Sequence, residues 1–327
     1  MVVKLDDKAR KILYQLDLNC RQSDKAIGRK VGLSKEVVRY RILKLQREGV
    51  IKRFYPIIDY IRLGYLPVRN FLKFRGVSPE KEAEIINYLK RENNTIRKVQ
   101  GGWDLNTTLR VKNIYEYKDF FDRFLLRYSH HIEKYWLSVV SNVWFFHLDY
   151  LLGENDEPSS RPKPDKVGYV KGSHGHAKID ARDQAVLKVL MENSRMKNID
   201  MARKINGTEM IVRYRMKKMM EAGVLVGFRP RLDLSTFGYT HFKIHMKLQN
   251  LTPERKQEIF NYVNHHPNII YMMELVGGDD LEIDYHAKDN RELYKFLADF
   301  RSKFSELIKD YEFMEYVEEH PISYLPK

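Results

Sequence analysis

The chain contains a single cysteine and no long apolar run. The one thiol, Cys20, excludes an intrachain disulfide and a cysteine-based metal cluster, which suits a reducing compartment. No stretch approaches the roughly 18 uninterrupted apolar residues of a membrane-spanning helix, and residues 1–7 lack the apolar core of a signal peptide. We therefore expect a cytoplasmic protein without a membrane segment. Its 327 residues exceed what one hydrophobic core usually serves, so we expect several domains.

The sequence of residues 4–65 recurs without a gap 174 residues later, as residues 178–239. Twenty of the 62 aligned positions are identical, and the run Val-Arg-Tyr-Arg at 38–41 returns at 212–215. Solenoid repeats have periods of about 20–50 residues, much shorter than this one. The repeat is therefore a duplicated globular module, and we expect its function to be exerted in pairs.

The positive charge of the chain is confined to this repeat. Lysine and arginine number 58 against 44 for aspartate and glutamate, a net charge of +14. Residues 1–66 carry +9 and residues 178–239 carry +6, whereas the rest of the chain carries −1. Positive charge concentrated on two copies of one small module indicates binding to a polyanion such as nucleic acid.

The first module predicts three helices followed by a strand. Each helix begins near a side chain able to cap it, and the helices are expected over about 6–19, 23–31 and 34–48. A strand follows at 50–58. Two helices joined by a tight turn that contains Gly32, the second helix being rich in arginine and lysine, form a helix-turn-helix.

The third helix places its apolar residues on one face and its basic residues on the other. In a helix-turn-helix this helix enters the major groove of DNA. We therefore predict DNA contacts from the outer face of each copy. In the first copy the residues are Ser34, Lys35, Arg39, Tyr40 and Lys44, and in the second copy they are Thr208, Arg213, Tyr214, Lys217 and Lys218.

The two recognition helices are expected to differ in strength. Arg39 and Arg213 could read guanine edges or contact phosphates, and the sequence leaves both roles open. The second helix begins with Glu209 where the first has Lys35, which puts a negative charge where a phosphate would approach. We therefore expect the first module to dominate DNA binding.

The other two segments, residues 67–152 and 240–327, each predict strand-helix-strand-strand-helix-strand, the ferredoxin-like arrangement. A segment rich in proline and glycine separates the two copies and is expected to be a linker. The fold class is thus α+β: a winged helix-turn-helix followed by a ferredoxin-like βαββαβ domain, with the pair repeated twice. The predicted boundaries are 1–66, 67–152, 153–177 (linker), 178–239 and 240–327.

Each copy contains a series of short motifs in an order typical of a known protein family. The first copy contains Leu5-Asp6, Ile12-Leu13, Ser34, Val38, Arg41, Leu45, Gly49-Val50-Ile51, Asp59, Leu63-Gly64-Tyr65 and Gly101-x-x-Asp104. The second contains Ile179-Asp180, Thr208, Val212, Arg215, Met219, Gly223-Val224-Leu225, Asp233, Gly238-Tyr239 and Gly277-x-x-Asp280. In this order and spacing the motifs resemble the Lrp/AsnC family of prokaryotic transcription regulators. The resemblance implies DNA binding by the first domain of each pair, and dimerisation and often amino-acid sensing by the second.

The resemblance also implies an effector site beside the two glycine-rich turns, with an amino acid as the ligand. The residues concerned are Gly101, Trp103, Asp104, Gly277, Gly278 and Asp280. The two aspartates could position the ammonium group of the ligand, or they could belong to hairpins in which glycine and aspartate are the usual residues. Both readings stay open. Because Trp103 corresponds to Asp279, the two sites are not expected to accept a ligand equally.

The expected partners are double-stranded DNA, an amino-acid effector and a second copy of the domain pair. We expect the two halves to form an intramolecular pseudo-dimer that assembles into larger homo-oligomers and associates with the nucleoid. No cofactor is expected. No metal site is expected either, because the histidine pairs at 130–131 and 265–266 complete no ligand set.

Two alternatives compete with a regulator. Some proteins with this domain pair are sirohaem decarboxylases, in which histidines of the sheet domain handle the tetrapyrrole. His241, His245 and His286 lie on predicted strands here, but residues 240–327 carry a net charge of −5, which would suit a polycarboxylate substrate poorly. We therefore expect the protein not to be an enzyme. The other alternative is a largely non-specific architectural chromatin protein, for which the positive charge alone would be enough.

Overall fold

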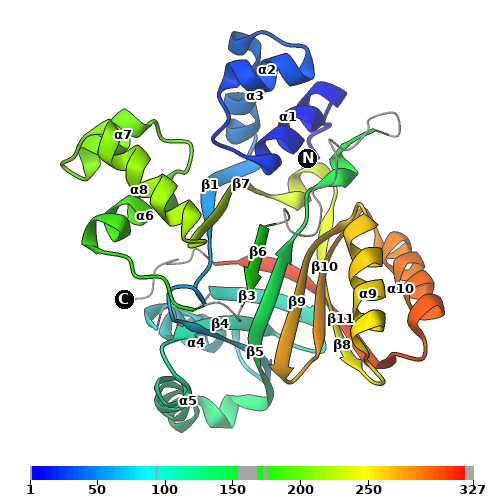
Figure 1. Cartoon of the computed structure of the whole chain (residues 1–327). Helices are drawn as coiled ribbons and strands as arrows, with labels where there is room; N and C mark the ends of the chain where they lie inside the picture. Colours follow the sequence, from blue (N-terminus) through cyan, green and yellow to red (C-terminus); the bar gives the residue numbers. More distant parts are fainter. Residues whose placement is uncertain (1, 93–94, 154–167, 172–174, 321–327) are drawn as a thin grey trace.

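The computed structural model describes residues 2–92, 95–153, 168–171 and 175–320. It confirms the predicted α+β fold, in which a winged helix-turn-helix module and a ferredoxin-like domain each occur twice. Figure 1 shows the two helical modules to one side of a large curved sheet, with the remaining helices packed on its outer surface. Among the described residues, no helix is long and apolar enough to cross a membrane.

The helix-turn-helix modules have closely similar elements. The first contains α1 (Asp7–Leu18), α2 (Asp24–Val31), α3 (Lys35–Arg47) and the wing strand β1 (Ile51–Ile58). The second contains α6 (Ala181–Glu192), α7 (Asn198–Lys204), α8 (Glu209–Glu221) and the wing strand β7 (Leu225–Leu232). The turn before the third helix requires a left-handed residue, which is Gly32 (φ 68°) in one copy and Asn206 (φ 50°) in the other. Asparagine tolerates this conformation better than most residues do.

The ferredoxin-like domains also correspond element by element. The first contains β2 (Leu66–Phe74), α4 (Pro79–Arg91), β3 (Thr95–Gly101), β4 (Leu105–Val111), α5 (Ile114–Tyr128) and β5 (Ile132–Phe145). The second contains β8 (Thr240–Leu248), α9 (Pro253–His265), β9 (Ile269–Gly277), β10 (Leu281–Ala287), α10 (Asn290–Phe304) and β11 (Ile308–Glu319). Short 3-10 turns lie at Ser129–His131, Asp149–Leu151 and Leu234–Phe237.

The strands of both ferredoxin-like domains form one closed ring. Their order is β2-β4-β3-β11-β8-β10-β9-β5, and β5 pairs back to β2. The two halves of the chain are therefore joined at two junctions, β3 with β11 and β5 with β9. Along β10, Leu281, Ile283 and Tyr285 pack under the helices, whereas Glu282 faces the ring interior and contacts Arg69 from the first half. The interior of the ring thus holds charged side chains beside a buried apolar cluster of Phe71, Val99, Trp103 and Met314.

The predicted linker contains one element that the sequence did not reveal. Gly168–Lys171 forms β6, which pairs antiparallel with the end of β5. The linker expected over 153–177 therefore includes four residues that pair with the sheet, and a backbone pairing of this kind leaves no mark on local hydrophobic periodicity. Residues 154–167 and 172–174 of the predicted linker lie outside the described residues.

The two helix-turn-helix modules share a single hydrophobic core. Their wing strands β1 and β7 pair antiparallel to form a two-stranded ribbon, seen between the modules in Figure 1. Each module also bonds to the wing of the other: Cys20 N donates to Phe228 O at 3.0 Å, and Ser194 N donates to Phe54 O at 3.1 Å. The ribbon therefore fixes the positions of the recognition helices relative to each other.

Candidate nucleic-acid interface and ligand cavity

The recognition helix of the first module, α3, presents an exposed cationic face. The Ser34 hydroxyl accepts a hydrogen bond from Val37 N at 3.2 Å and so begins the helix. Burial of Val38, Ile42 and Leu45 then turns the predicted DNA-contacting residues outward. Those residues, all exposed, are Lys35, Arg39, Tyr40 and Lys44. Within the described part of the chain, Lys35 and Arg39 have no ion-pair partner, and Lys44 has only Glu48, at 3.7 Å.

The corresponding face of α8 is largely neutralised by neighbouring carboxylates. Thr208, one of the predicted DNA contacts, caps the helix, and Tyr214 is exposed. The cations, however, are paired. Arg213 binds Glu209 at 2.8 Å, Lys217 lies 3.7 Å from Glu221, and Lys218 binds the buried Asp183 at 2.9 Å. These pairs give a physical reason why α8 would bind DNA more weakly than α3. The difference in DNA affinity stays a prediction.

The aspartates of the glycine-rich turns bind the protein's own backbone. Asp104 accepts hydrogen bonds from Phe74 N at 2.7 Å and from Lys73 Nζ at 3.0 Å. Asp280 accepts one from Leu248 N at 2.9 Å. Both carboxylates therefore tie their hairpin to the neighbouring strand, which is the structural role that the sequence analysis left open.

The glycines of these turns allow the two halves to approach each other. A Cβ on Gly102 would lie 1.7 Å from Glu312 Oε1, and a Cβ on Gly278 would lie 1.6 Å from Trp136 Nε1. Trp103, which follows the first pair, is buried and donates from Nε1 to Glu312 Oε2 at 2.9 Å. The turns are thus packed into the junctions between the halves.

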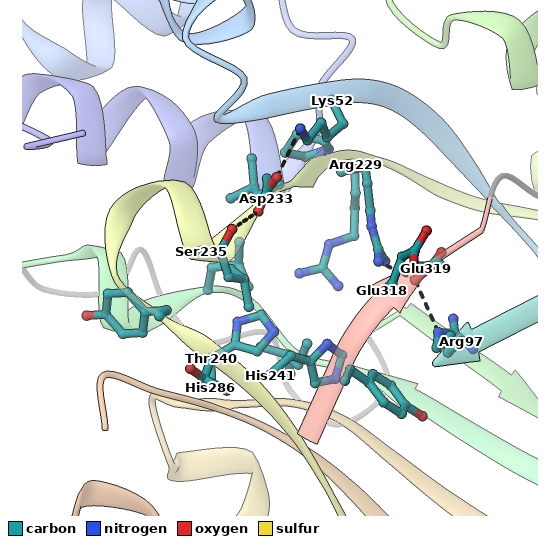
Figure 2. A pocket seen from close by; sticks show the side chains of 18 of the residues that line it. Lys52, Arg97, Arg229, Asp233, Ser235, Thr240, His241, His286, Glu318 and Glu319 are labelled. Atoms are coloured by element: carbon teal, nitrogen blue, oxygen red, sulfur yellow. Dashed lines mark hydrogen bonds and ion pairs between the residues drawn. The ribbon is translucent and has the colours of Figure 1, made fainter. Parts of the chain in front are cut away.

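A cavity of about 570 Å³ lies elsewhere, between the wing ribbon and one end of the strand ring. Figure 2 shows its wall, with Arg229 and Lys52 from the ribbon and Glu319 and Arg97 from the ring. The volume is in the range of small-molecule sites. Its cations are Lys52, Arg53, Arg97, Arg229 and Arg231.

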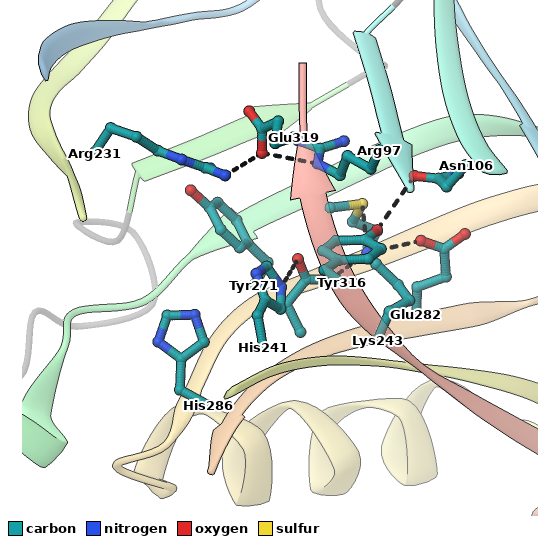
Figure 3. Close-up of polar contacts among 12 residues, drawn as sticks. Arg97, Asn106, Arg231, His241, Lys243, Tyr271, Glu282, His286, Tyr316 and Glu319 are labelled. Atoms are coloured by element: carbon teal, nitrogen blue, oxygen red, sulfur yellow. Dashed lines mark hydrogen bonds and ion pairs between the residues drawn. The ribbon is translucent and has the colours of Figure 1, made fainter. Parts of the chain in front are cut away.

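Two buried carboxylates hold the arginines of the cavity. Glu319 lies between Arg97, at 3.1 Å, and Arg231, which also contacts it (Figure 3). Burial alone would raise the pKa of Glu319, but the charges of Arg97 and Arg231 lower it to about 2. On the opposite wall Asp17 binds Arg229 at 2.5 Å, and its pKa is likewise lowered despite burial. The arginines of the cavity are therefore placed to bind carboxylates, and in this structure those carboxylates are Glu319 and Asp17 of the chain itself.

Two histidines lie at the floor of the cavity. His286 Nδ1 is 2.9 Å from the Tyr150 hydroxyl, and His241 Nε2 is 2.9 Å from Asp284 Oδ2. Burial lowers the pKa of both, that of His286 well below its usual value and that of His241 against the opposing effect of Asp284. The lowered pKa values favour the neutral form of both imidazoles, which can donate and accept hydrogen bonds.

Both histidines are candidates in the sequence, but the arginines around them are not. The net charge of residues 240–327 leaves these arginines out, because Arg229 and Arg231 come from the wing strand β7 and Arg97 from the first half. The net charge of residues 240–327 therefore does not describe the cavity, whose lining combines these cations with the carboxylates of Asp17, Asp233, Glu315, Glu318 and Glu319. Only the strand pairings could have revealed which segments meet here.

Comparison with known proteins identifies the family. A family model described as "Winged helix-turn-helix DNA-binding" matches residues 5–52 and again residues 179–226. The HTH-type transcriptional regulator FL11 of Pyrococcus horikoshii is 32% identical over 124 residues, which cover 37% of this chain and 81% of that protein. The chain belongs to the Lrp/AsnC family. The proline dehydrogenase transcriptional activator of Rhodobacter capsulatus is 31% identical over 117 residues, 35% of this chain and 76% of the relative.

A solved structure extends the likeness to the tandem arrangement of this Lrp/AsnC protein. The siroheme decarboxylase NirDL superposes with a TM-score of 0.61 over 95% of this chain and 91% of its own, at 16% identity. The same enzyme in complex with an iron-uroporphyrin III analogue gives 0.59, over 96% and 91%, again at 16% identity. At this identity the likeness shows the fold alone.

Proposed function

We propose that this Lrp/AsnC-family chain is a sequence-specific, DNA-binding transcription regulator in which α3 supplies most of the affinity. The observation that carries the proposal is the exposed face of α3, where Lys35 and Arg39 have no ion-pair partner among the described residues. Cations of this kind release counterions when they meet phosphates, which is the main source of affinity for DNA. On α8 the same contacts would first require Arg213 to leave Glu209.

The chain acts as a pseudo-dimer within one molecule. The ribbon β1–β7 and the junctions β3–β11 and β5–β9 support this part of the proposal, since each joins one half to the other. The proposal also includes the assembly of these pseudo-dimers into larger homo-oligomers. Light scattering on the purified chain measures the assembly directly: a single-chain mass at all concentrations would limit the proposal to the pseudo-dimer.

An effector that carries a carboxylate binds in the cavity beneath the ribbon. The support is chemical: Arg97 and Arg231 already hold the Glu319 carboxylate there, whereas Asp104 and Asp280 of the glycine-rich turns are engaged by backbone. An amino acid offers the same group. Binding would shift the ribbon against the ring, and hence the spacing of α3 and α8, if the ligand's affinity differs between the two arrangements.

A thermal-shift screen of the twenty amino acids tests this effector site. We expect a compound that raises the melting temperature of the wild type and loses that effect with Arg231→Gln. A compound that acts equally on Arg231→Gln would place the effector outside the cavity. No response to any of the twenty would remove the amino-acid effector from the proposal.

Selection of duplexes from a random DNA library distinguishes a regulator from an architectural protein. The proposal predicts enrichment of a defined sequence by the wild type and loss of retained DNA with the double variant Arg39→Ala, Lys44→Ala. Retention without enrichment would instead indicate non-specific, architectural binding. No retention at low salt would contradict DNA binding altogether.

A second candidate function is a reaction on a tetrapyrrole, and the cavity is the observation that favours it. Arginines suited to carboxylates surround the two neutral histidines His241 and His286, on a fold shared with siroheme decarboxylase NirDL. The test is an absorption spectrum of the protein mixed with sirohaem, followed by product analysis. A spectral shift with loss of carbon dioxide would establish the enzyme. Absence of both would leave the regulator alone.

A further inference from the structure

Three positions inside the strand ring differ together between the two halves. In the second half they are His245 on β8, Asp279 in the turn after β9, and Glu282 on β10. The corresponding residues of the first half are Phe71, Trp103 and Asn106. The correspondence is structural as well, because Glu282 pairs directly with His245 across β10 and β8, as Asn106 pairs with Phe71 across β4 and β2. The first half thus has two aromatic side chains and an amide at these three positions, whereas the second half has three side chains that can bind a metal ion.

The three side chains of the second half converge. His245 Nδ1 is 2.7 Å from Asp279 Oδ2 and 3.8 Å from Glu282 Oε1. One ligand atom from each residue lies within 4.8 Å of the others, and all three residues are buried. Three donors this close can be bridged by a single ion, since metal–nitrogen and metal–oxygen bonds are about 2.0–2.2 Å long.

The two oxygens of Glu282 differ in their contacts with the described residues. Lys243 Nζ binds Oε2 at 3.0 Å, and Arg69 Nη1 approaches the same oxygen at 3.4 Å. Oε1 faces His245 and, within the described part of the chain, has no hydrogen-bond partner, although the Glu282 side chain is fully buried. A buried acceptor without a partner is costly and rare in folded proteins. The Nε2 atom of His245 is also buried and has no hydrogen-bond partner among the residues that the structure describes.

We propose that His245, Asp279 and Glu282 bind one divalent transition-metal ion, such as Zn²⁺. One imidazole nitrogen and two carboxylate oxygens suit Zn²⁺ and its neighbours in the first transition row. Lys243 is the outer partner that orients Glu282, a role typical of groups around metal ligands. The first half cannot bind a second ion in this way, because phenylalanine and tryptophan supply no ligand at the equivalent positions.

The ion would join the second half to the junction between the halves. Asp279 follows Gly278, which packs against Trp136 of β5, and the His245 ring packs edge-on against Phe71 with centroids 4.5 Å apart. A metal here therefore stabilises the closed ring, at a site distinct from the cavity. The sequence analysis expected no metal because it considered only neighbouring histidines, whereas these ligands are 34 and 37 residues from His245 in sequence.

The test is a titration of chelator-treated full-length protein with Zn²⁺ by calorimetry, and with Co²⁺ by visible absorption. We expect one ion per chain, a Co²⁺ spectrum typical of nitrogen and oxygen ligands, and a higher melting temperature with either ion. His245→Phe introduces the first-half residue, and Asp279→Asn keeps the size of the side chain. Each should weaken binding by at least about tenfold, the usual scale for such sites.

The control is His265→Gln, which removes an exposed histidine outside the set and should leave binding unchanged. The proposal would be overturned if the folded wild type bound neither ion. It would also be overturned if His245→Phe and Asp279→Asn both bound ions as the wild type does, which would assign the binding to the surface. If His245 and Asp279 only form a hydrogen bond with each other, the folded wild type would bind neither ion. None of these measurements depends on DNA binding.

Discussion

Arg195 donates from Nη2 to Asp24 Oδ1 at 2.6 Å, across the boundary between the two helix-turn-helix modules. At the equivalent position of the first copy, Arg21 Nη2 donates to Asn198 Oδ1, also at 2.6 Å. The contact is thus repeated by the internal symmetry of the chain, but only one of the two is an ion pair. Together they hold the modules in one orientation, which a DNA-binding pseudo-dimer requires for correctly spaced recognition helices.

Replacement of Arg195 by alanine should destabilise the chain by about 1–3 kcal/mol, the range for hydrogen bonds that involve charged groups. The substitution removes the ion pair with Asp24 and the hydrogen bonds to the carbonyls of Cys20 and Gln22. Urea unfolding followed by circular dichroism measures the change. Arg21→Ala is the matched variant and should cost less, because its partner Asn198 is neutral. A reversed order would show that the charge on Asp24 contributes nothing.

Glu209→Lys should strengthen DNA binding through the second module. The change frees Arg213 from its carboxylate partner and reproduces the charge of Lys35. Because each added phosphate contact steepens the salt dependence by about 0.9 in log–log slope, the slope should rise by about one or two. Glu258→Lys, the same charge change on α9, is the control. Equal gains from both variants would mean that net charge, and not the α8 face, governs affinity.

Stability should fall as the pH drops below about 6.5, the usual pKa of histidine. Burial lowers the pKa values of His241 and His286 in the folded state, so the unfolded chain binds more protons in this range. The stability that these two residues contribute is therefore present above pH 6.5 and lost below it, by at most about 1.4 kcal/mol per pH unit for each histidine.

Urea unfolding of the wild type and of His286→Gln between about pH 7.5 and 5 measures this contribution. The variant should show a flatter dependence of unfolding free energy on pH, and the exposed control His265→Gln should show none of the flattening. Parallel curves for the wild type and His286→Gln would contradict the buried, neutral state of this histidine.

Local structure was predictable because its causes are local. The caps Asp6, Ser23 and Ser34, and the apolar stripe of α3, lie within one turn or one helix of the residues they organise. The helices expected over about 6–19, 23–31 and 34–48 correspond to α1, α2 and α3 for the same reason. The end of strand β11 at Glu319 depends instead on a distant segment, because β3 of the other half pairs with it there.

The candidate sites depend on contacts between segments that are far apart, and the sequence did not reveal them. Glu319 meets Arg97 and Arg231 only because the ring closes and the ribbon crosses its end. The difference between Asp279 and Trp103 was visible from the repeat, but its link to His245 and Glu282 required the strand register. By contrast, the predicted inequality of α3 and α8 rested on the charge of Glu209, which in the structure pairs with Arg213 four residues along the same helix.

The most direct test of the account is fluorescence anisotropy of labelled duplex DNA with the full chain and two double variants, at low and at physiological salt. Arg39→Ala, Lys44→Ala removes two cations of α3, of which Arg39 has no ion-pair partner in the described part of the chain. Arg213→Ala, Lys217→Ala removes two cations of α8 that both have an ion-pair partner. The account predicts steep salt dependence for the wild type, and a loss of affinity several times larger for the α3 pair than for the α8 pair. A larger loss for the α8 pair, or wild-type affinity that does not change with salt, would contradict it.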